Sequence, residues 1–163
     1  MNIVLLEPEI PYNAGAIGRT CLATGTTLHL VRPLGFDISE RAVRRAGLDY
    51  WKLVDVRDYN NFESFMEENE GKGDMFFATT KAEKTYTDVC YNENSYIIFG
   101  RESAGIPEEI LVKNREKCIR IPMLDEMRSL NLSVSAGIII YEAMRQNGFS
   151  GLTEKGQLHR LEW

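Results

Sequence analysis

Short apolar runs alternate with helix-forming segments along the chain, and this alternation constrains the fold more than any other feature. Residues 3–6, 28–31 and 96–99 are runs of the length expected for strands buried on both faces. The pattern predicts further strands over 51–56, 74–79 and 118–121, and helices over 14–24, 39–47, 60–70, from 107, and from 129 to about 146. Strands that alternate with helices predict an α/β fold, a parallel sheet with helices on both faces.

The composition is that of one globular domain with no general affinity for nucleic acid. Hydrophobic residues make up 44% and charged residues 26% of 163 residues. The net charge of -5 argues against indiscriminate coating of nucleic acid, so any RNA contact needs a local basic patch. Cys21, Cys90 and Cys118 form no CxxC or Cys/His cluster, which fits a reducing cytoplasm. No stretch approaches the roughly 20 apolar residues that cross a bilayer.

A glycine-containing segment follows the first predicted strand. Asn13, a good N-cap residue, precedes Gly15 and Gly18 at a helix start, and Arg19 follows. This resembles a dinucleotide-binding fingerprint, but Asn13 replaces the first glycine. The second strand also ends in Arg32 instead of the acid that would bind a ribose hydroxyl. The glycines would equally serve tight packing.

Polar loops follow two later strands. The loop after 96–99 contains Gly100 and Glu102, and the segment after 118–121 contains Ser129, Asn131 and Ser133 at a helix start. Because parallel strands end at the same edge of a sheet, such loops form a ligand crevice. Each loop also has a plain explanation, as a turn in the first case and as helix capping in the second.

Several catalytic classes are disfavoured. The two histidines, His29 and His159, are not placed for a Ser-His-Asp triad or a metal cluster. The chain has no GxxxxGK[ST] segment for P-loop chemistry. No metal is therefore expected.

The last helix has almost no polar face between residues 134 and 144. One sheet cannot cover so many apolar side chains. The helix is either buried inside a monomer or packs its far side against a second subunit, with Tyr141 as an interface anchor.

Together these stretches resemble the SPOUT family of RNA methyltransferases, specifically its small TrmL/YibK-like branch of tRNA ribose 2'-O-methyltransferases. The three family motifs correspond to residues 13–19, 99–107 and 121–133, and the likeness covers about residues 2 to 149. The resemblance implies a single domain over 1–150 with a deep C-terminal trefoil knot, a homodimer, and S-adenosyl-L-methionine as cofactor. Residues 151–163 match no family element, so they form a flexible tail or contact the partner subunit.

The resemblance also implies roles for individual residues. Cofactor binding falls to Ala78, Thr79, Gly100, Ile121, Ser129 and Leu130. Arg19 acts on the ribose 2'-hydroxyl, and the catalytic group is completed by Glu102, Asn131 and Ser133. Because arginine is a poor base, Arg19 could instead bind the adjacent phosphate, whose oxygen or a water would accept the proton.

The implied substrate is the wobble nucleotide, position 34, of tRNA, a cytidine or modified uridine in leucine isoacceptors. Candidate RNA-binding residues are Arg41, Arg44, Arg45, Lys81 and Arg128. Tyr12 or Tyr50 could stack on a base of the anticodon loop. The alternatives are a catalytically silent RNA-binding relative and a dinucleotide-binding oxidoreductase.

Overall fold

The computed structural model describes residues 1–39, 41 and 48–162. In this part of the chain seven parallel strands form one sheet in the order β3-β2-β1-β6-β4-β7-β5. The strands are β1 (Asn2–Leu6), β2 (Thr27–Val31), β3 (Val56–Tyr59), β4 (Met75–Ala78), β5 (Lys84–Thr85), β6 (Tyr96–Phe99) and β7 (Cys118–Arg120). The helices are α1 (Pro11–Thr24), α3 (Phe62–Asn69), α4 (Glu108–Lys113) and α5 (Leu132–Gln146), with short 3-10 helices η1 (Asp49–Leu53) and η2 (Arg115–Lys117).

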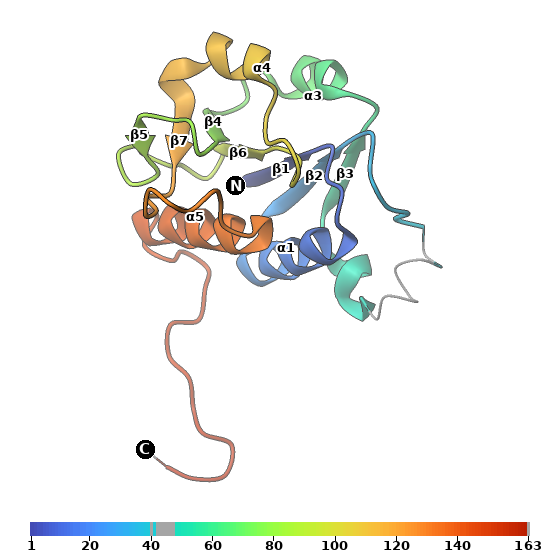
Figure 1. Ribbon diagram of the computed structural model, residues 1–163. Helices are drawn as coiled ribbons and strands as arrows, with labels where there is room; N and C mark the ends of the chain where they lie inside the picture. Colours follow the sequence, from blue (N-terminus) through green and yellow to red (C-terminus); the bar gives the residue numbers. More distant parts are fainter. Residues whose placement is uncertain (40, 42–47, 163) are drawn as a thin grey trace.

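Helices cover both faces of this sheet. Figure 1 shows α1 and α5 side by side on one face and α3 and α4 on the other. The predicted α/β class with a parallel sheet is confirmed. None of the described helices is long and apolar enough to cross a membrane.

Strand β1 lies near the middle of the sheet, with β2 on one side and β6 on the other. Its side chains alternate between two cores, as the period of a strand requires. Ile3 and Leu5 pack on the face covered by α1 and α5, whereas Val4 and Leu6 pack with residues of α3 and α4. A strand buried on both faces must be apolar throughout, which explains why the first residues predicted a central strand.

Two local predictions were wrong. Residues 51–56 do not form a strand, because 49–53 form η1 and the strand begins only at Val56. Asn13 does not cap α1, because the helix begins at Pro11 with Ile10 at the N-cap. The two-residue edge strand β5 was not predicted, and the helix predicted over 39–47 lies almost wholly outside the described residues.

The glycines of α1 serve packing. A Cβ added to Gly18 would lie 2.7 Å from the Trp51 ring, and one added to Gly15 would lie 3.2 Å from the Leu48 side chain. Residues of η1 and its preceding turn therefore approach α1 closely because Gly15 and Gly18 have no side chains. The spacing that resembled a dinucleotide fingerprint is explained by this helix contact.

A directed chain of hydrogen bonds connects β6, α3, β3, β2 and β1. Tyr96 donates to Asn69 Oδ1 (3.2 Å), and Asn69 donates to the Tyr59 hydroxyl (3.2 Å). That hydroxyl lies 3.0 Å from His29 Nδ1, and His29 Nε2 lies 3.1 Å from Asn2 Oδ1. Because the amide oxygen of Asn2 can only accept, His29 carries its proton on Nε2 and accepts from Tyr59 at Nδ1.

The neutral form of His29 is thus built into the fold. Its side chain is fully buried, and burial, followed by the positive charge of Arg57, lowers its pKa from 6.5 to about 4. A second proton on the His29 ring, at Nδ1, would face the Tyr59 hydroxyl, which donates its own proton to Nδ1. Protonation therefore opposes folding.

We expect the free energy of unfolding to fall as the pH is lowered from 6.5 to about 4. In this window the unfolded chain binds a proton at His29 that the folded chain does not, and the difference between the two pKa values corresponds to about 3 kcal/mol. Urea denaturation at a series of pH values measures the effect. His29→Gln keeps a donor and an acceptor but cannot titrate, so its stability should change less over the same range; an unchanged pH profile would contradict the assignment.

Candidate active site

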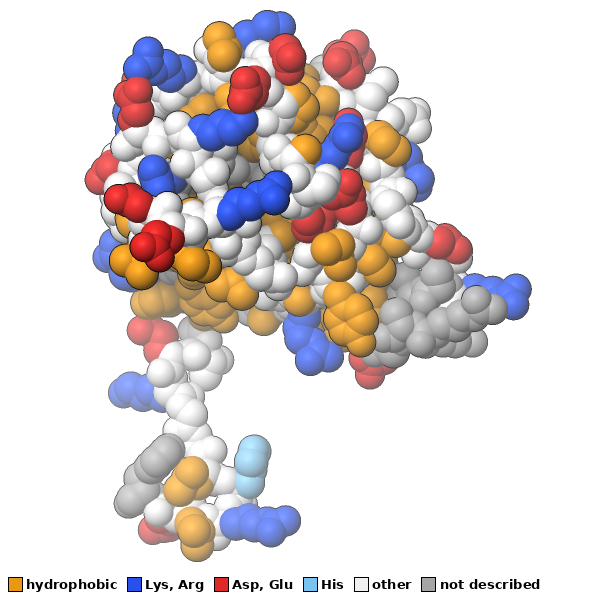
Figure 2. Space-filling view, viewed as in Figure 1, with side chains coloured by type: hydrophobic (Ala, Val, Ile, Leu, Met, Phe, Trp, Pro, Cys, Tyr) orange, Lys and Arg blue, Asp and Glu red, His pale blue; other side chains and the backbone are white. Residues whose placement is uncertain are grey.

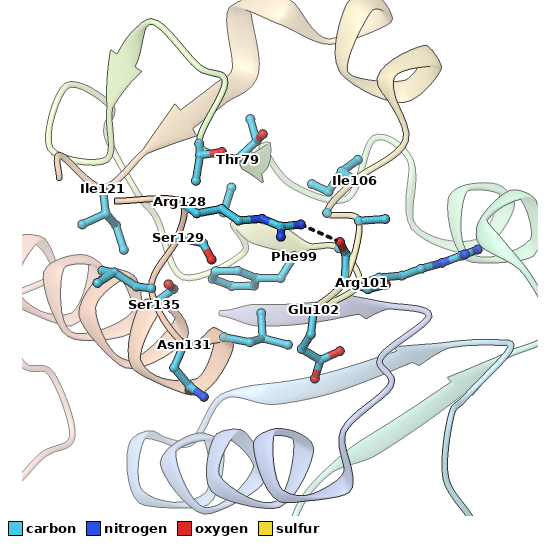
Figure 3. A pocket seen from close by; sticks show the side chains of 18 of the residues that line it. Thr79, Phe99, Arg101, Glu102, Ile106, Ile121, Arg128, Ser129, Asn131 and Ser135 are labelled. Carbon is cyan, nitrogen blue, oxygen red and sulfur yellow. Dashed lines mark hydrogen bonds between the residues drawn. The ribbon is translucent and has the colours of Figure 1, made fainter. Parts of the chain in front are cut away.

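A cavity of about 680 Å³ opens where β4, β6 and β7 end. The loops after these strands line it, together with the starts of α1 and α5. All six residues expected to bind the cofactor lie in its lining: Ala78, Thr79, Gly100, Ile121, Ser129 and Leu130. Figure 3 shows Thr79, Ile121 and Ser129 arranged around this hollow. The volume lies within the usual range of small-molecule sites.

Gly100 is required by the way the loop after β6 folds back. A Cβ at this position would lie 2.1 Å from the carbonyl carbon of Gly105 and 2.2 Å from the nitrogen of Ile106. Gly105 has a φ of 74° and donates its N–H to the carbonyl of Arg101 at 2.8 Å. The backbone of residues 105–106 therefore occupies the space where any other residue at position 100 would place its side chain.

The carboxylate of Glu102 holds this loop against the start of α1. Its Oε2 accepts from the N–H of Glu9 (2.8 Å), and its Oε1 accepts from the N–H of Ile10 (3.3 Å) and from Asn13 Nδ2 (2.9 Å). A helix N-terminus favours a negative group because its first N–H groups lack helical partners. Glu102 is thus an anchored anion, and three donors already occupy its oxygens.

Asn13 extends this contact to α5. Its Oδ1 accepts from Asn131 Nδ2 at 3.0 Å. Asn131 in turn caps α5, because its Oδ1 accepts from the N–H of Ser133 (2.8 Å) and of Val134 (3.3 Å). The Ser133 hydroxyl also donates to Asn131 Oδ1 at 2.7 Å, although Ser133 does not line the cavity.

Asn13 was missed as a site residue. Its position in the sequence fitted a helix N-cap, and this interpretation explained the residue without a role in the site. The structure shows instead a buried amide, 6% exposed, that bridges Glu102 and Asn131. The available signal was a polar residue within an otherwise apolar helix start, which needs a hydrogen-bond partner when buried.

Two further acids fix the same loop. Glu9 accepts from the N–H of Ser103 (2.9 Å) and from its hydroxyl (2.8 Å), and Glu7 pairs with Arg101. In Figure 3 the Arg101 side chain points away from the cavity. These contacts tie the loop after β6 to the loop after β1 on the outer side of the cavity.

Basic side chains lie at the cavity and near its mouth. Arg128 reaches across the opening and donates to the carbonyl of Ser103 at 3.3 Å (Figure 3). Lys81 also lines the cavity, and its Nζ lies 2.5 Å from Glu108 Oε1. This hydrogen bond lowers the pKa of Glu108. Figure 2 shows Lys and Arg side chains on this face, interspersed with acids. Of the other predicted RNA contacts, Arg41 is exposed, whereas Arg44 and Arg45 lie outside the described residues.

Arg19 and Tyr141 lie apart from the cavity lining. Arg19 is exposed on α1, six residues after Asn13, and its guanidinium carbon lies 4.5 Å from the centre of the Tyr50 ring. Tyr141 is 49% exposed on the neighbouring helix α5, as is Val134 at 50%. The structure therefore brings together Glu102 and Asn131 in one chain, but not Arg19 with them.

The described residues contain no group of three or more His, Cys, Asp or Glu side chains that could hold a metal ion. Burial raises the pKa of the Cys21 thiol to about 12 and also raises the pKa of Cys118. Both thiols stay protonated at neutral pH and lack the thiolate that nucleophilic or ligating cysteines need.

Comparison with known proteins gives a consistent result. Residues 1–141 match the model of the SpoU rRNA Methylase family. The chain is 43% identical over 157 residues to a tRNA (cytidine(34)-2'-O)-methyltransferase from Photorhabdus asymbiotica, covering 93% of this chain and 96% of the relative.

Solved structures of RNA methyltransferases are also similar to this chain. One described as "Structural insights into the 2-OH methylation of C/U34 on tRNA" has a TM-score of 0.83 and 43% identity, covering 91% of this chain and 96% of that one. An AdoMet-bound rRNA methyltransferase from Sinorhizobium meliloti has a TM-score of 0.75 and 26% identity, covering 88% of this chain and 55% of that one.

Gly100→Ala should damage the cavity and the fold together, because the added methyl group meets backbone atoms that cannot rotate away. We expect a loss of about 2 kcal/mol or more in stability and S-adenosyl-L-methionine binding weakened roughly tenfold or more. Thermal denaturation and isothermal titration calorimetry measure the two effects. Gly156→Ala is the matched control, since a Cβ there meets nothing within 4 Å. Equal behaviour of the two variants would refute the close approach at Gly100.

Proposed function

The chain belongs to the SpoU rRNA methylase family, and on this premise we propose that it methylates the ribose 2'-hydroxyl of nucleotide 34 in tRNA, with S-adenosyl-L-methionine as methyl donor. The observation that carries the proposal is the convergence of three loops, after β4, β6 and β7, on one cavity beside the Glu102–Asn13–Asn131 network. A cytidine or a modified uridine is the target base, and leucine isoacceptors are the substrates that the resemblance favours. The enzyme acts in the cytoplasm.

The lining suits this cofactor. Ile121 and Leu130 offer apolar surface, Thr79 and Ser129 offer hydroxyls, and Gly100 allows the loop after β6 to fold back beside the cavity. The bound cofactor supplies a methyl group on a positively charged sulfur. Such a donor needs no metal and no covalent attachment to the protein, in keeping with the protonated state of the buried thiols.

Positioning is the main task of this chain's own residues. Methyl transfer requires the 2'-oxygen to lie in line with the methyl group at close distance. Glu102, Asn13 and Asn131 fix the loop after β6, the start of α1 and the start of α5 relative to one another. Because the Glu102 oxygens already accept three hydrogen bonds, we assign Glu102 to orientation instead of proton removal.

A second copy of the chain completes the site in this proposal. Arg19 lies on an exposed part of α1 and not in its own cavity, while α5 beside it exposes Val134 and Tyr141. Figure 2 shows hydrophobic side chains gathered along the lower edge of the molecule, where Figure 1 places these two helices. A homodimer formed through this layer would bury the apolar side chains and present Arg19 of one subunit to the partner's cavity.

The knot that the family resemblance implies belongs to the same part of the chain. We place it in the loops after β6 and β7, which both line the cavity and are joined by the bond from Arg128 to the carbonyl of Ser103. Residues 1–150 then form the catalytic domain. Residues 151–162 extend away from it in Figure 1.

Purified protein incubated with S-adenosyl-L-methionine and individual leucine tRNAs should produce a 2'-O-methyl group at nucleotide 34. Mass spectrometry of nuclease fragments locates the modification. A tRNA assembled with a 2'-deoxy nucleotide at position 34 is the control and should accept no methyl group. Methylation at another nucleotide, or none with any tRNA, would refute the proposal.

A mixing experiment tests whether the site is shared. Arg19→Ala leaves the cavity intact, and Ser129→Trp blocks the cavity but keeps Arg19. If Arg19 serves the partner, mixed dimers regain one complete site, and a random mixture should recover about a quarter of wild-type activity. Each variant alone should be nearly inactive, and Arg19→Ala should still bind the cofactor. No recovery, although subunits exchange, would place Arg19 in the site of its own chain.

A further inference from the structure

The guanidinium of Arg19 has an aromatic partner and, among residues 1–39, 41 and 48–162, no acidic one. Its central carbon lies 4.5 Å from the centre of the Tyr50 ring, and the side chain is otherwise exposed. Within the described part of the chain no carboxylate pairs with Arg19, although most of the other paired arginines are bound to acids, as in Arg32–Asp58 and Arg115–Glu83. Of the described residues, Tyr50 is therefore the one whose contact positions the Arg19 guanidinium.

Tyr50 is itself held in place. Its hydroxyl donates to the carbonyl of Gly15 at 2.9 Å, one turn before Arg19 on the same helix. Position 15 has little room for a side chain, because a Cβ there would lie 3.2 Å from Leu48 and 3.6 Å from the Tyr50 hydroxyl. Trp51 contacts Gly18 in the same way. These contacts of segment 48–51 with α1 thus fix the position of the Tyr50 ring along the helix.

Stacking on an aromatic ring leaves the N–H groups of an arginine free to form hydrogen bonds. A guanidinium lies with its flat face on an aromatic ring, whereas its five N–H groups point outward in the plane. A charged arginine with a free N–H edge is suited to bind a phosphate through two parallel hydrogen bonds.

We propose that Tyr50 is a positioning residue for Arg19, and that the N–H edge it leaves free binds the RNA phosphate next to the methylated ribose. This inference rests on the proposed function, since it assigns the contact that Arg19 makes with the tRNA. It also separates the two tyrosines considered for base stacking. One face of the Tyr50 ring is already covered by Arg19, whereas Tyr12 is 89% exposed at the start of α1.

Four proteins test the proposal: Tyr50→Phe, Tyr50→Leu, Arg19→Ala, and the double variant Arg19→Ala/Tyr50→Leu. Tyr50→Phe keeps the ring and loses only the bond to Gly15, so kcat/KM for tRNA should stay within about twofold of wild type. Tyr50→Leu removes the ring and should lower kcat/KM for tRNA roughly fivefold, the size of an exposed cation–π contact. The KM for S-adenosyl-L-methionine should not change in either variant.

The double variant tests whether Tyr50 acts through Arg19. If Tyr50 acts only through Arg19, Tyr50→Leu should lower the activity no further once Arg19 is alanine. Full additivity of the two losses would overturn the proposal, because it would mean that Tyr50 contacts the RNA itself or supports the fold independently. Thermal denaturation of all four proteins shows whether a loss of folded protein accounts for any difference.

The salt dependence of tRNA binding tests the contact between Arg19 and an RNA phosphate. Arg19→Ala should reduce the slope of log K against log salt concentration by about 0.7, the value for one contact to single-stranded nucleic acid. Arg57→Ala, an exposed arginine on β3, is the matched control and should leave the slope unchanged. An unchanged slope in Arg19→Ala would overturn the phosphate contact.

An NMR measurement makes the geometry testable without activity. The Tyr50 ring current should shift the Arg19 Nε–H proton, and this shift should persist in Tyr50→Phe and vanish in Tyr50→Leu. Absence of the ring-current shift in the wild-type protein would refute the stacking. If the shift is present but no tRNA is methylated, the proposed function fails and the placement of Arg19 by Tyr50 stands.

Discussion

The carboxylate of Glu102 is the contact on which the geometry of the site depends. It lies where the loop after β6 meets the start of α1, and it satisfies two main-chain N–H groups there together with the amide of Asn13. Asn13 then reaches Asn131 at the start of α5. Three segments distant in sequence are thereby fixed to one another at the edge of the sheet where parallel strands open a crevice. An acid in this position acts through its hydrogen bonds, since the N–H groups of Glu9 and Ile10, just before α1, and the amide of Asn13 supply the donors.

The fold could be predicted from the sequence because its signals are local. The run at residues 3–6 is apolar without alternation, and only a strand covered on both faces needs that pattern. The start of α4 after Pro107 and the end of α5 at Gln146 follow from equally local signals. The strand predicted over 51–56 failed because Tyr50 and Trp51 pack on α1, a tertiary contact that overrides the strand preference of aromatic residues.

The cavity lining could be predicted only in part. The resemblance supplied Gly100, Ile121 and Leu130, and the fold brings them together because the loops after parallel strands share one edge. Asn13 could not be assigned, because nothing in a sequence shows that an amide near a helix start faces a glutamate about 90 residues away. For the same reason the place of Arg19 outside its own cavity emerged only from the structure.

All the described strands run in one direction, so every strand begins at the edge opposite the cavity. Met1 lies at that far edge because it precedes β1, and α5 ends there because it starts at Leu132 beside the cavity and runs back along the sheet. Both ends of the described chain therefore leave the domain on the side away from the hollow. A molecule tethered to a solid support through its amino terminus would hold the cavity mouth outward, toward large macromolecules diffusing in from solution.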